Sequence, residues 1–171
     1  MSDEMADDMA DESARTAQHT ADLVRAGMLR NDRATTALGM RVGGVQPGAA
    51  TLTMTVRDDM LNGHDICHGG LIATLADSAF AFACNSHGEL TVASGFAIDL
   101  LAPGRLGDVL TARCTEVSKA GRTGVYDVDV TNQRGERIAV FRGRSHTMKG
   151  KPAVPHALSM NLSPDPAPGA A

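Results

Sequence analysis

Residues 62–84 read NGHDICHGGLIATLADSAFAFAC, and this stretch decides the fold. After His68 it is small or apolar throughout, with Asp77 as the one carboxylate. Five alanines between residues 73 and 83 favour a helix, which we expect to begin at the pair Gly69-Gly70. Because apolar residues occur on nearly every side of this helix, we expect it to be buried all round.

Strand patterns lie on both sides of the predicted helix. Leu52, Met54 and Val56 alternate with polar residues, which predicts a half-buried strand. Similar patterns occupy residues 94–101, 110–115, 126–130 and 138–141. Glycine-containing turns separate the last three strands and predict a meander of antiparallel hairpins. The order of two strands, one helix and four strands favours an α+β fold, in which a curved antiparallel sheet wraps around one central helix.

The two ends of the chain differ in composition from this central unit. Residues 1–15 are acidic, and we expect a disordered tail there. Weak amphipathic spacing predicts a helix over residues 16–29, so the domain is expected to span residues 16–150. Residues 151–171 are rich in proline and alanine and are expected to form a loose tail. The acidic start lacks the apolar segment of a secretory signal, so we expect a cytoplasmic protein.

Composition excludes several classes of function. The 171 residues suggest one domain, and a net charge of −4 with 3% aromatic residues argues against nucleic-acid binding. The odd set Cys67, Cys84 and Cys114 fits reduced thiols better than a disulfide framework. His64, Cys67 and His68 lie too close together and lack a second pair of ligands, so no metal site is expected.

Gly69 and Asp77 carry the catalytic hypothesis. The free N–H groups at a helix start can stabilise an oxyanion, although a glycine pair is also typical of a tight loop. A buried Asp77 would be either a catalytic carboxylate or a structural partner of a basic group. Eight residues separate the two, about 12 Å along a helix axis. Two antiparallel copies of the helix would place Gly69 of one opposite Asp77 of the other, which predicts a dimer.

Two flanking segments are more ambiguous. Asn62 would orient a water or bind a carbonyl, and His68 would titrate or fix the loop; for each alone, a loop-structure role is favoured. The hairpin KAGRTG at residues 119–124 offers two cations and two glycines to a phosphate. A solvated basic turn is the favoured interpretation of that hairpin when it is considered alone.

Several motifs together resemble the hotdog-fold acyl-CoA thioesterases, most closely the phenylacetate-degradation type. They are Asn62-Gly63-His64, His68-Gly69-Gly70, Leu75-Ala76-Asp77, Asn85 and the strand end Ala102-Pro103-Gly104. The resemblance covers about residues 38–150. It implies hydrolysis of an acyl-CoA thioester, with (hydroxy)phenylacetyl-CoA or a similar aromatic ester as substrate. It also implies that Asp77 is the nucleophile or general base and that the Gly69 N–H polarises the thioester carbonyl.

The same resemblance implies the remaining site and the assembly. Asn62 and His68 would position substrate, water or the loop. The expected substrate-binding residues are Gly70, Ser94, Gly95, Arg122, Thr123 and Gly124. No cofactor is implied, because coenzyme A is part of the substrate, and dimers or tetramers with sites between subunits are expected.

The acyl group is less well defined than the reaction. Relatives often carry small polar residues near the acyl pocket where this chain has Gly95 and Phe96, which leaves acyl specificity open. An acyl-CoA sensor on the same fold is the alternative from another class, but no helix-turn-helix precedes Asp77. A dehydratase would have only His68 as its base.

Overall fold

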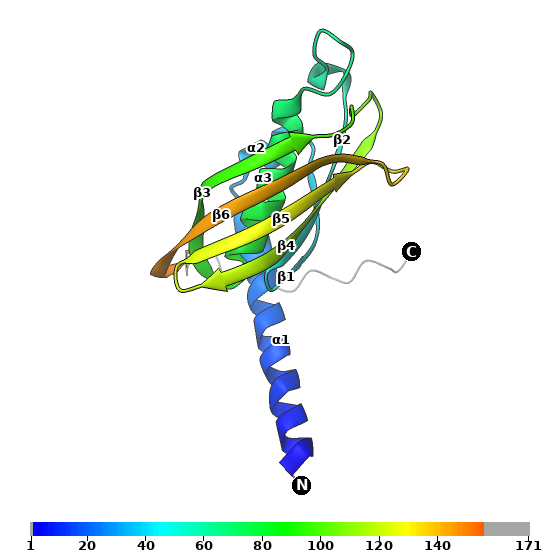
Figure 1. Ribbon diagram of the computed structural model, residues 1–171. Coiled ribbons are helices and arrows are strands. Elements are labelled where there is room, and N and C mark those ends of the chain that lie inside the picture. The colour runs from blue at the N-terminus through cyan, green and yellow to red at the C-terminus, as the bar shows by residue number, and fades with distance from the viewer. Residues whose placement is uncertain (1, 156–171) are drawn as a thin grey trace, which may run out of the picture.

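The computed structural model describes residues 2–155, and for residues 2–7 only the backbone. Three helices, one short 3-10 helix and six strands follow one another along the described chain (Figure 1). Their bounds are α1 (Ser2–Leu29), α2 (Arg33–Ala37), β1 (Arg41–Gln46), β2 (Ala49–Thr55), η1 (Asp58–Met60), α3 (Gly69–Asn85), β3 (Glu89–Leu100), β4 (Val109–Ala120), β5 (Thr123–Thr131) and β6 (Arg137–Pro152).

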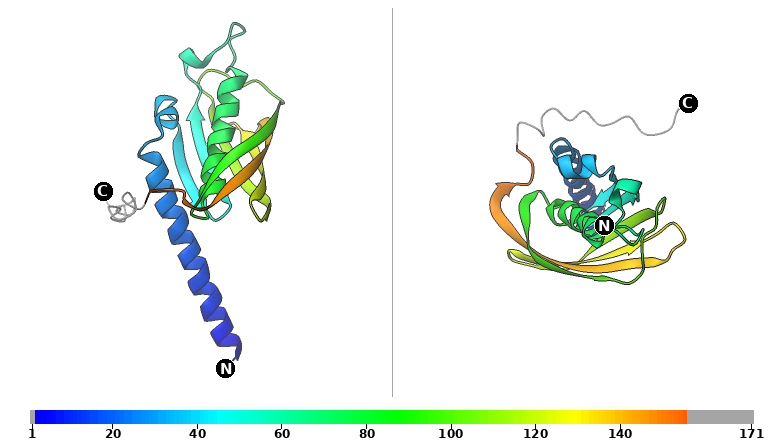
Figure 2. Two further views of the ribbon diagram at one scale, coloured as in Figure 1. Left: turned by 90° about the vertical axis from the view of Figure 1, so that its left-hand side faces the viewer. Right: turned by 90° about the horizontal axis from the view of Figure 1, so that it is seen from above.

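The six strands form one antiparallel sheet in the order β1-β2-β4-β5-β6-β3. The sheet curves around α3, which lies in its hollow (Figure 2). The predicted α+β hotdog arrangement is therefore confirmed, as is the meander of β4, β5 and β6. Strands β1 and β3 are the two edges of the sheet, and β3 follows α3 directly in the chain.

Alternating side chains build the core between the sheet and α3. The predicted inward-facing residues of three strands are all buried: Leu52, Met54, Leu110, Ala112, Cys114, Tyr126, Val128 and Val130. Gly143 of β6 lets α3 approach the sheet closely, because a Cβ there would lie 3.0 Å from the ring of Phe80. The period-2 pattern of the sequence therefore reports correctly which face of each strand meets the helix.

Helix α3 is less buried than its composition predicts. One side packs into the sheet through residues such as Leu75, Ala79 and Phe80. A stripe on the other side is only half-buried or exposed: Gly70, Ala73, Thr74, Asp77, Ser78 and Ala81. The expectation of burial all round is thus wrong for the single chain, because the sheet encloses only part of the helix circumference.

The N-terminal helix is longer than predicted. α1 begins at Ser2, so residues 2–15, predicted to be disordered, are helical instead. Alanine and glutamate favour helix, and acidic side chains near a helix N-terminus oppose its positive dipole end. Figure 1 shows the first half of α1 projecting from the domain, whereas Ala21 and Val24 are buried against it.

The C-terminal strand extends past the predicted domain boundary. β6 continues to Pro152, so the tail predicted from residue 151 begins later, and residues 156–171 lie outside the described chain. Val154 then contacts α1, where a Cβ on Gly27 would lie 2.3 Å from a Val154 methyl. None of the helices within residues 2–155 is both long and apolar enough to cross a membrane.

Candidate active site

The start of α3 has the geometry of an anion-binding site. His68 is the N-cap, and its Nδ1 accepts a hydrogen bond from the Gly70 N–H at 3.1 Å. The His68 carbonyl accepts from the Leu71 N–H at 2.9 Å. Within residues 2–155 the Gly69 N–H has no hydrogen-bond partner. This donor therefore remains available to an oxygen with developing negative charge.

Glycine at position 69 permits close packing against β3. A Cβ at Gly69 would lie 2.5 Å from Cδ1 of Leu100, at the end of β3. The glycine thus brings the helix start against the edge strand and also leaves its own N–H unshielded. The packing interpretation and the oxyanion interpretation of the glycine pair are compatible, since the same missing side chain serves both.

Asp77 is a half-buried carboxylate without a partner. Its side chain forms no hydrogen bond or ion pair to any residue of the described chain. Burial raises the pKa of Asp77 above its usual value. The pKa of the Cys84 thiol is raised to about 12, chiefly by burial, and the nearby charge of Asp77 contributes to this rise. A structural ion pair therefore does not account for Asp77, and the catalytic interpretation is favoured.

Asn62 and His68 both shape the loop before α3. The Asn62 side-chain oxygen accepts from the His64 N–H at 2.9 Å, and its backbone N–H donates to the Ile66 carbonyl at 2.9 Å. Asp65 adopts a positive φ of 56° within this turn. The loop-structure role favoured from the sequence is thus present for both residues. Contact with a substrate stays a prediction.

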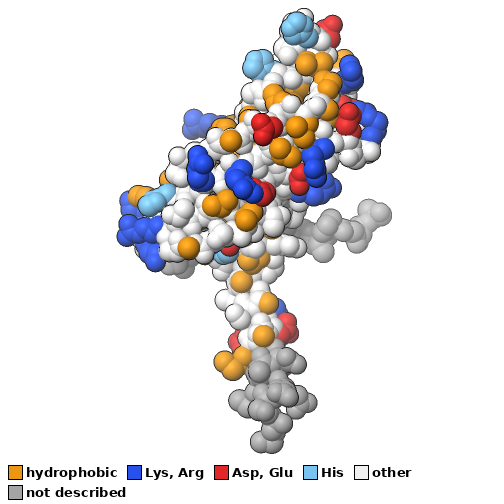
Figure 3. All heavy atoms as spheres, in the orientation of Figure 1, with side chains coloured by type: hydrophobic (Ala, Val, Ile, Leu, Met, Phe, Trp, Pro, Cys, Tyr) orange, Lys and Arg blue, Asp and Glu red, His pale blue; other side chains and the backbone are white. Residues whose placement is uncertain are grey.

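The predicted phosphate-binding hairpin lies at the opposite end of the molecule from Gly69. The Arg122 carbonyl accepts from the Thr147 N–H at 2.7 Å, and Thr147 pairs with Thr91 on β3. Thr91 in turn bonds to Asn85, the last residue of α3. Lys and Arg side chains gather at this end of the sheet (Figure 3). One chain therefore does not bring Arg122 to its own Gly69.

The other predicted substrate-binding residues have distinct environments. Thr123 is exposed beside Arg122, but Gly124 is buried, where a Cβ would lie 2.6 Å from Oγ of Ser145. Gly124 thus has a packing role, whatever its relation to substrate. On β3, the exposed Ser94 donates to the Arg144 carbonyl at 3.1 Å. Gly95 follows at an irregularity in the β3–β6 register.

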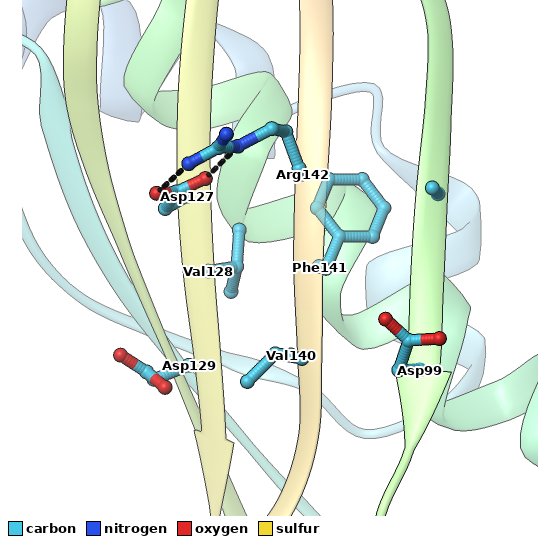
Figure 4. Close-up of a pocket in the computed structure, with 8 residues that line it drawn as sticks. Asp99, Asp127, Val128, Asp129, Val140, Phe141 and Arg142 are labelled. Carbon is cyan, nitrogen blue, oxygen red and sulfur yellow. Dashed lines mark hydrogen bonds and ion pairs between the residues drawn. The ribbon is translucent and has the colours of Figure 1, made fainter.

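A pocket on the outer face of the sheet contains none of the predicted site residues. It spans β3, β5 and β6 and carries the carboxylates of Asp99, Asp127 and Asp129 (Figure 4). Arg142 spans the pocket and bonds both oxygens of Asp127 at 2.6 Å. Its acidic lining is unsuited to the phosphates of coenzyme A. Among residues 2–155, no group of three or more His, Cys, Asp and Glu side chains is placed to hold a metal ion.

Sequence comparison identifies the family. Residues 64–139 match the model of the thioesterase superfamily. The acyl-coenzyme A thioesterase PaaI of Escherichia coli K12 is 48% identical over 123 residues, which are 72% of this chain and 88% of PaaI. The chain belongs to the thioesterase superfamily. It is an enzyme of this superfamily, related to PaaI over most of its length.

Solved structures agree with this assignment. The E. coli PaaI protein from the phenylacetic acid degradation operon is 46% identical, with a TM-score of 0.77, and the alignment covers 78% of this chain and 97% of PaaI. A Streptococcus mutans UA159 protein bound to acetyl CoA is 30% identical, with a TM-score of 0.62, and the alignment covers 64% of this chain and 88% of that one. The hotdog thioesterase fold is therefore shown both by sequence and by structure.

Two residues of β3 that were not among the predicted catalytic or substrate-binding residues lie beside α3. Leu100 contacts the helix start at Gly69, and Phe96 lies half-exposed on the same strand. The strand pattern contains the relevant signal, because Phe96, Ile98 and Leu100 alternate and must share one face of β3. That this face is the one toward α3 follows only from the pairing of β3 with β6.

Proposed function

We propose that this chain hydrolyses acyl-CoA thioesters and that its substrates carry an aromatic acyl group such as (hydroxy)phenylacetyl. The proposal rests on one observation: helix α3 carries two polar groups that have no hydrogen-bond partner in the described chain. Asp77 has no partner in the described chain, and neither has the Gly69 N–H. A carboxylate and a free backbone donor are the two groups that thioester hydrolysis requires.

The chemistry divides between these two groups. The Gly69 N–H stabilises the negative charge that develops on the thioester oxygen. Asp77 either attacks the carbonyl carbon or removes a proton from the water that attacks it. The C–S bond then breaks, and coenzyme A leaves as the thiolate. When water attacks, the free acid forms directly; when Asp77 attacks, water must then hydrolyse the anhydride on Asp77 to release the acid and restore the carboxylate. The thioester carbonyl is already electrophilic, so the reaction requires neither a metal nor a cofactor beyond the CoA of the substrate.

We infer that the complete site forms between two copies of the chain. Gly69 and Asp77 of one helix lie about 12 Å apart along its axis, too far to act on one carbonyl. Strand β3 has an open edge, and the stripe of α3 that carries Asp77 is uncovered by its own sheet. Edge-to-edge pairing of β3 would place two α3 helices side by side and cover both surfaces.

The dimer would also supply the phosphate site. In one chain Arg122 lies at the far end of the sheet from Gly69, whereas an antiparallel partner presents its own hairpin beside that Gly69. The exposed Arg122 and Thr123 would then bind the CoA phosphates. The acetyl CoA bound in the S. mutans relative supports a CoA-binding surface on this fold.

The aromatic acyl group is supported by the relation to PaaI. The structure of that relative belongs to a protein of the phenylacetic acid degradation operon. A panel of acyl-CoA esters, with released CoA measured by a thiol reagent, tests the proposal. We expect the highest kcat/KM for arylacetyl esters. Absence of CoA release from every ester, despite measurable ester binding, would favour an acyl-CoA sensor instead.

A further inference from the structure

Phe96 is an exposed aromatic residue on the inner face of the edge strand. It pairs in register with Gly143 of β6, the residue that Phe80 of α3 covers. Residues directly paired across antiparallel strands point to the same face of the sheet. The ring of Phe96 therefore lies on the helix side of β3, yet 46% of the residue's surface is exposed.

Phe96 is level with Asp77 along the line where α3 runs beside β3. The helix and the strand run in opposite directions and meet at both ends, where Gly69 contacts Leu100 and Asn85 bonds to Thr91. Asp77 is eight residues from each end of α3, about 12 Å in either direction. Phe96 is four residues from Leu100, about 13 Å.

Asp77 also lies on the flank of α3 that faces β3. At 3.6 residues per turn, Asp77 is rotated by about 80° from Gly69 and about 60° from Phe80. Gly69 faces Leu100 of β3, and Phe80 faces Gly143 beside Phe96. The half-buried carboxylate and the exposed ring of Phe96 therefore lie on the same side of α3, at the same level.

The ring of Phe96 is held in place by a row of other rings. It stacks on Phe141 with centroids 4.8 Å apart. Phe141 contacts Phe80 at 5.9 Å, and Phe80 contacts Tyr126 at 5.3 Å. The last three are buried, so Phe96 is the open end of an aromatic row that begins in the core. An aryl group bound beside Phe96 would extend that row by one ring.

We propose that Phe96 forms an aromatic wall of the acyl site and selects aryl over alicyclic and aliphatic acyl groups. This inference rests on the proposed thioesterase function and assigns its acyl preference to one side chain. Aromatic pairs gain energy from ring geometry beyond the apolar area they bury. The preference should therefore depend on a ring at position 96 rather than on its volume alone.

The test compares phenylacetyl-CoA with cyclohexylacetyl-CoA, whose acyl groups differ mainly in aromaticity. The readout is the ratio of kcat/KM for the two esters. In Phe96→Leu we expect this ratio to fall by about 2- to 10-fold. Phe96→Tyr keeps a ring and should retain the wild-type ratio. Val92→Ala is the matched control, because Val92 is equally exposed on β3 but pairs with His146 on the outer face.

Three results would overturn the inference, and each is distinct from failure of the proposed function. They are an unchanged ratio in Phe96→Leu, a fall of equal size in Val92→Ala, and loss of the wild-type ratio in Phe96→Tyr. A changed oligomer mass in Phe96→Leu with an unchanged ratio likewise assigns Phe96 to subunit contact alone. The proposed function fails only if the wild-type protein releases CoA from neither ester.

Discussion

Two carboxylates in different regions of the molecule have opposite environments. Asp108, at the corner where two loops meet, accepts hydrogen bonds from the Arg105 N–H, the Gln133 side chain and Arg134 at 2.8–2.9 Å. These donors, led by Arg134, hold its pKa at about 2. Asp77, on the open flank of α3, has no such donor in the described chain, and burial raises its pKa.

The free-energy cost of burying a carboxylate is compensated at Asp108 and not at Asp77 in the described chain. Taking a carboxylate out of water is costly, and the Asp108 corner offsets that cost with donors from three residues. At Asp77 no donor within residues 2–155 offsets it, so the carboxylate is available to a substrate or a water. One acid therefore stabilises the fold, whereas the other is expected to carry chemistry at some cost in stability.

Among the substitutions that test this contrast, Asp77→Asn should have the largest effect. The amide keeps the shape but loses the charge, so kcat should fall by about 10²- to 10⁴-fold. Binding of a CoA ester should be retained, and thermal stability should not fall. Steady-state hydrolysis and ester titration measure the two effects, and Ser78→Ala on the same open stripe serves as the control. Hydrolysis near the wild-type rate would remove Asp77 from the mechanism.

Asp108→Asn should have the converse effect. Loss of the charged acceptor should lower the free energy of unfolding by about 2 kcal/mol, with kcat of the folded protein nearly unchanged. Urea denaturation gives the stability. Asp129→Asn is the control, because Asp129 pairs with Arg137 at the surface, where ion pairs contribute little. Equal stability losses in both variants would contradict the structural role assigned to Asp108.

Asp108 and Asp77 should change the stability of the protein with pH in opposite directions. The lowered pKa of Asp108 means that its contribution is present above the unfolded value near pH 4 and is lost as pH falls toward about 2. The raised pKa of Asp77 means that its contribution is present below about pH 4 and is lost as pH rises through the folded value. Protonation of Asp108 removes only the interactions of its own charge. The loss of stability that it causes in acid should therefore be no larger than the loss caused by Asp108→Asn.

Urea unfolding of the wild type and both asparagine variants from pH 2 to 7 measures these two slopes. Asp108→Asn should flatten the loss of stability in acid, whereas Asp77→Asn should remove a decline above pH 4. The same slope in all three proteins would show that neither carboxylate has the environment described.

His68→Ala should have a smaller effect on stability than Asp108→Asn. It removes the acceptor of the Gly70 N–H at the start of α3, a loss of about 1 kcal/mol in the free energy of unfolding. His68→Asn provides a side-chain acceptor suited to the N-cap position and should restore most of it. Chemical denaturation of the three proteins tests this. A large loss in kcat that Asn does not rescue would instead indicate direct contact with the substrate.

Local patterns were sufficient to predict the order of elements. The apolar helix at residues 69–84 and the alternation at 110–115 and 126–130 depend on periodicity, and the structure places them as predicted. The start of α1 was missed because an acidic composition resembles disorder even where alanine favours a helix. The open stripe on α3 was missed because composition does not report how much of a helix one sheet can cover.

The candidate site likewise has some features that the sequence reveals and others that only the structure shows. Glycine at 69 and a lone acid at 77 are visible in the sequence, since each is an exception to its surroundings. The sequence does not show that Asp77 lacks a donor while Asp108 has several, because Gln133 and Arg134 are 25 and 26 residues away from Asp108. Nor does it show that Phe96 lies on the helix side of β3, since that depends on its pairing with Gly143.

The sequence by itself determined the helix that carries Asp77, the glycine that starts it and the alternating strands around it. These features depend on backbone geometry within a few residues, so a local pattern encodes them. Only the tertiary structure shows which carboxylate has hydrogen-bond donors, which side of α3 its own sheet leaves open and which ring lies on the helix side of β3. Those outcomes depend on strand register and on contacts between distant segments, which no local pattern contains.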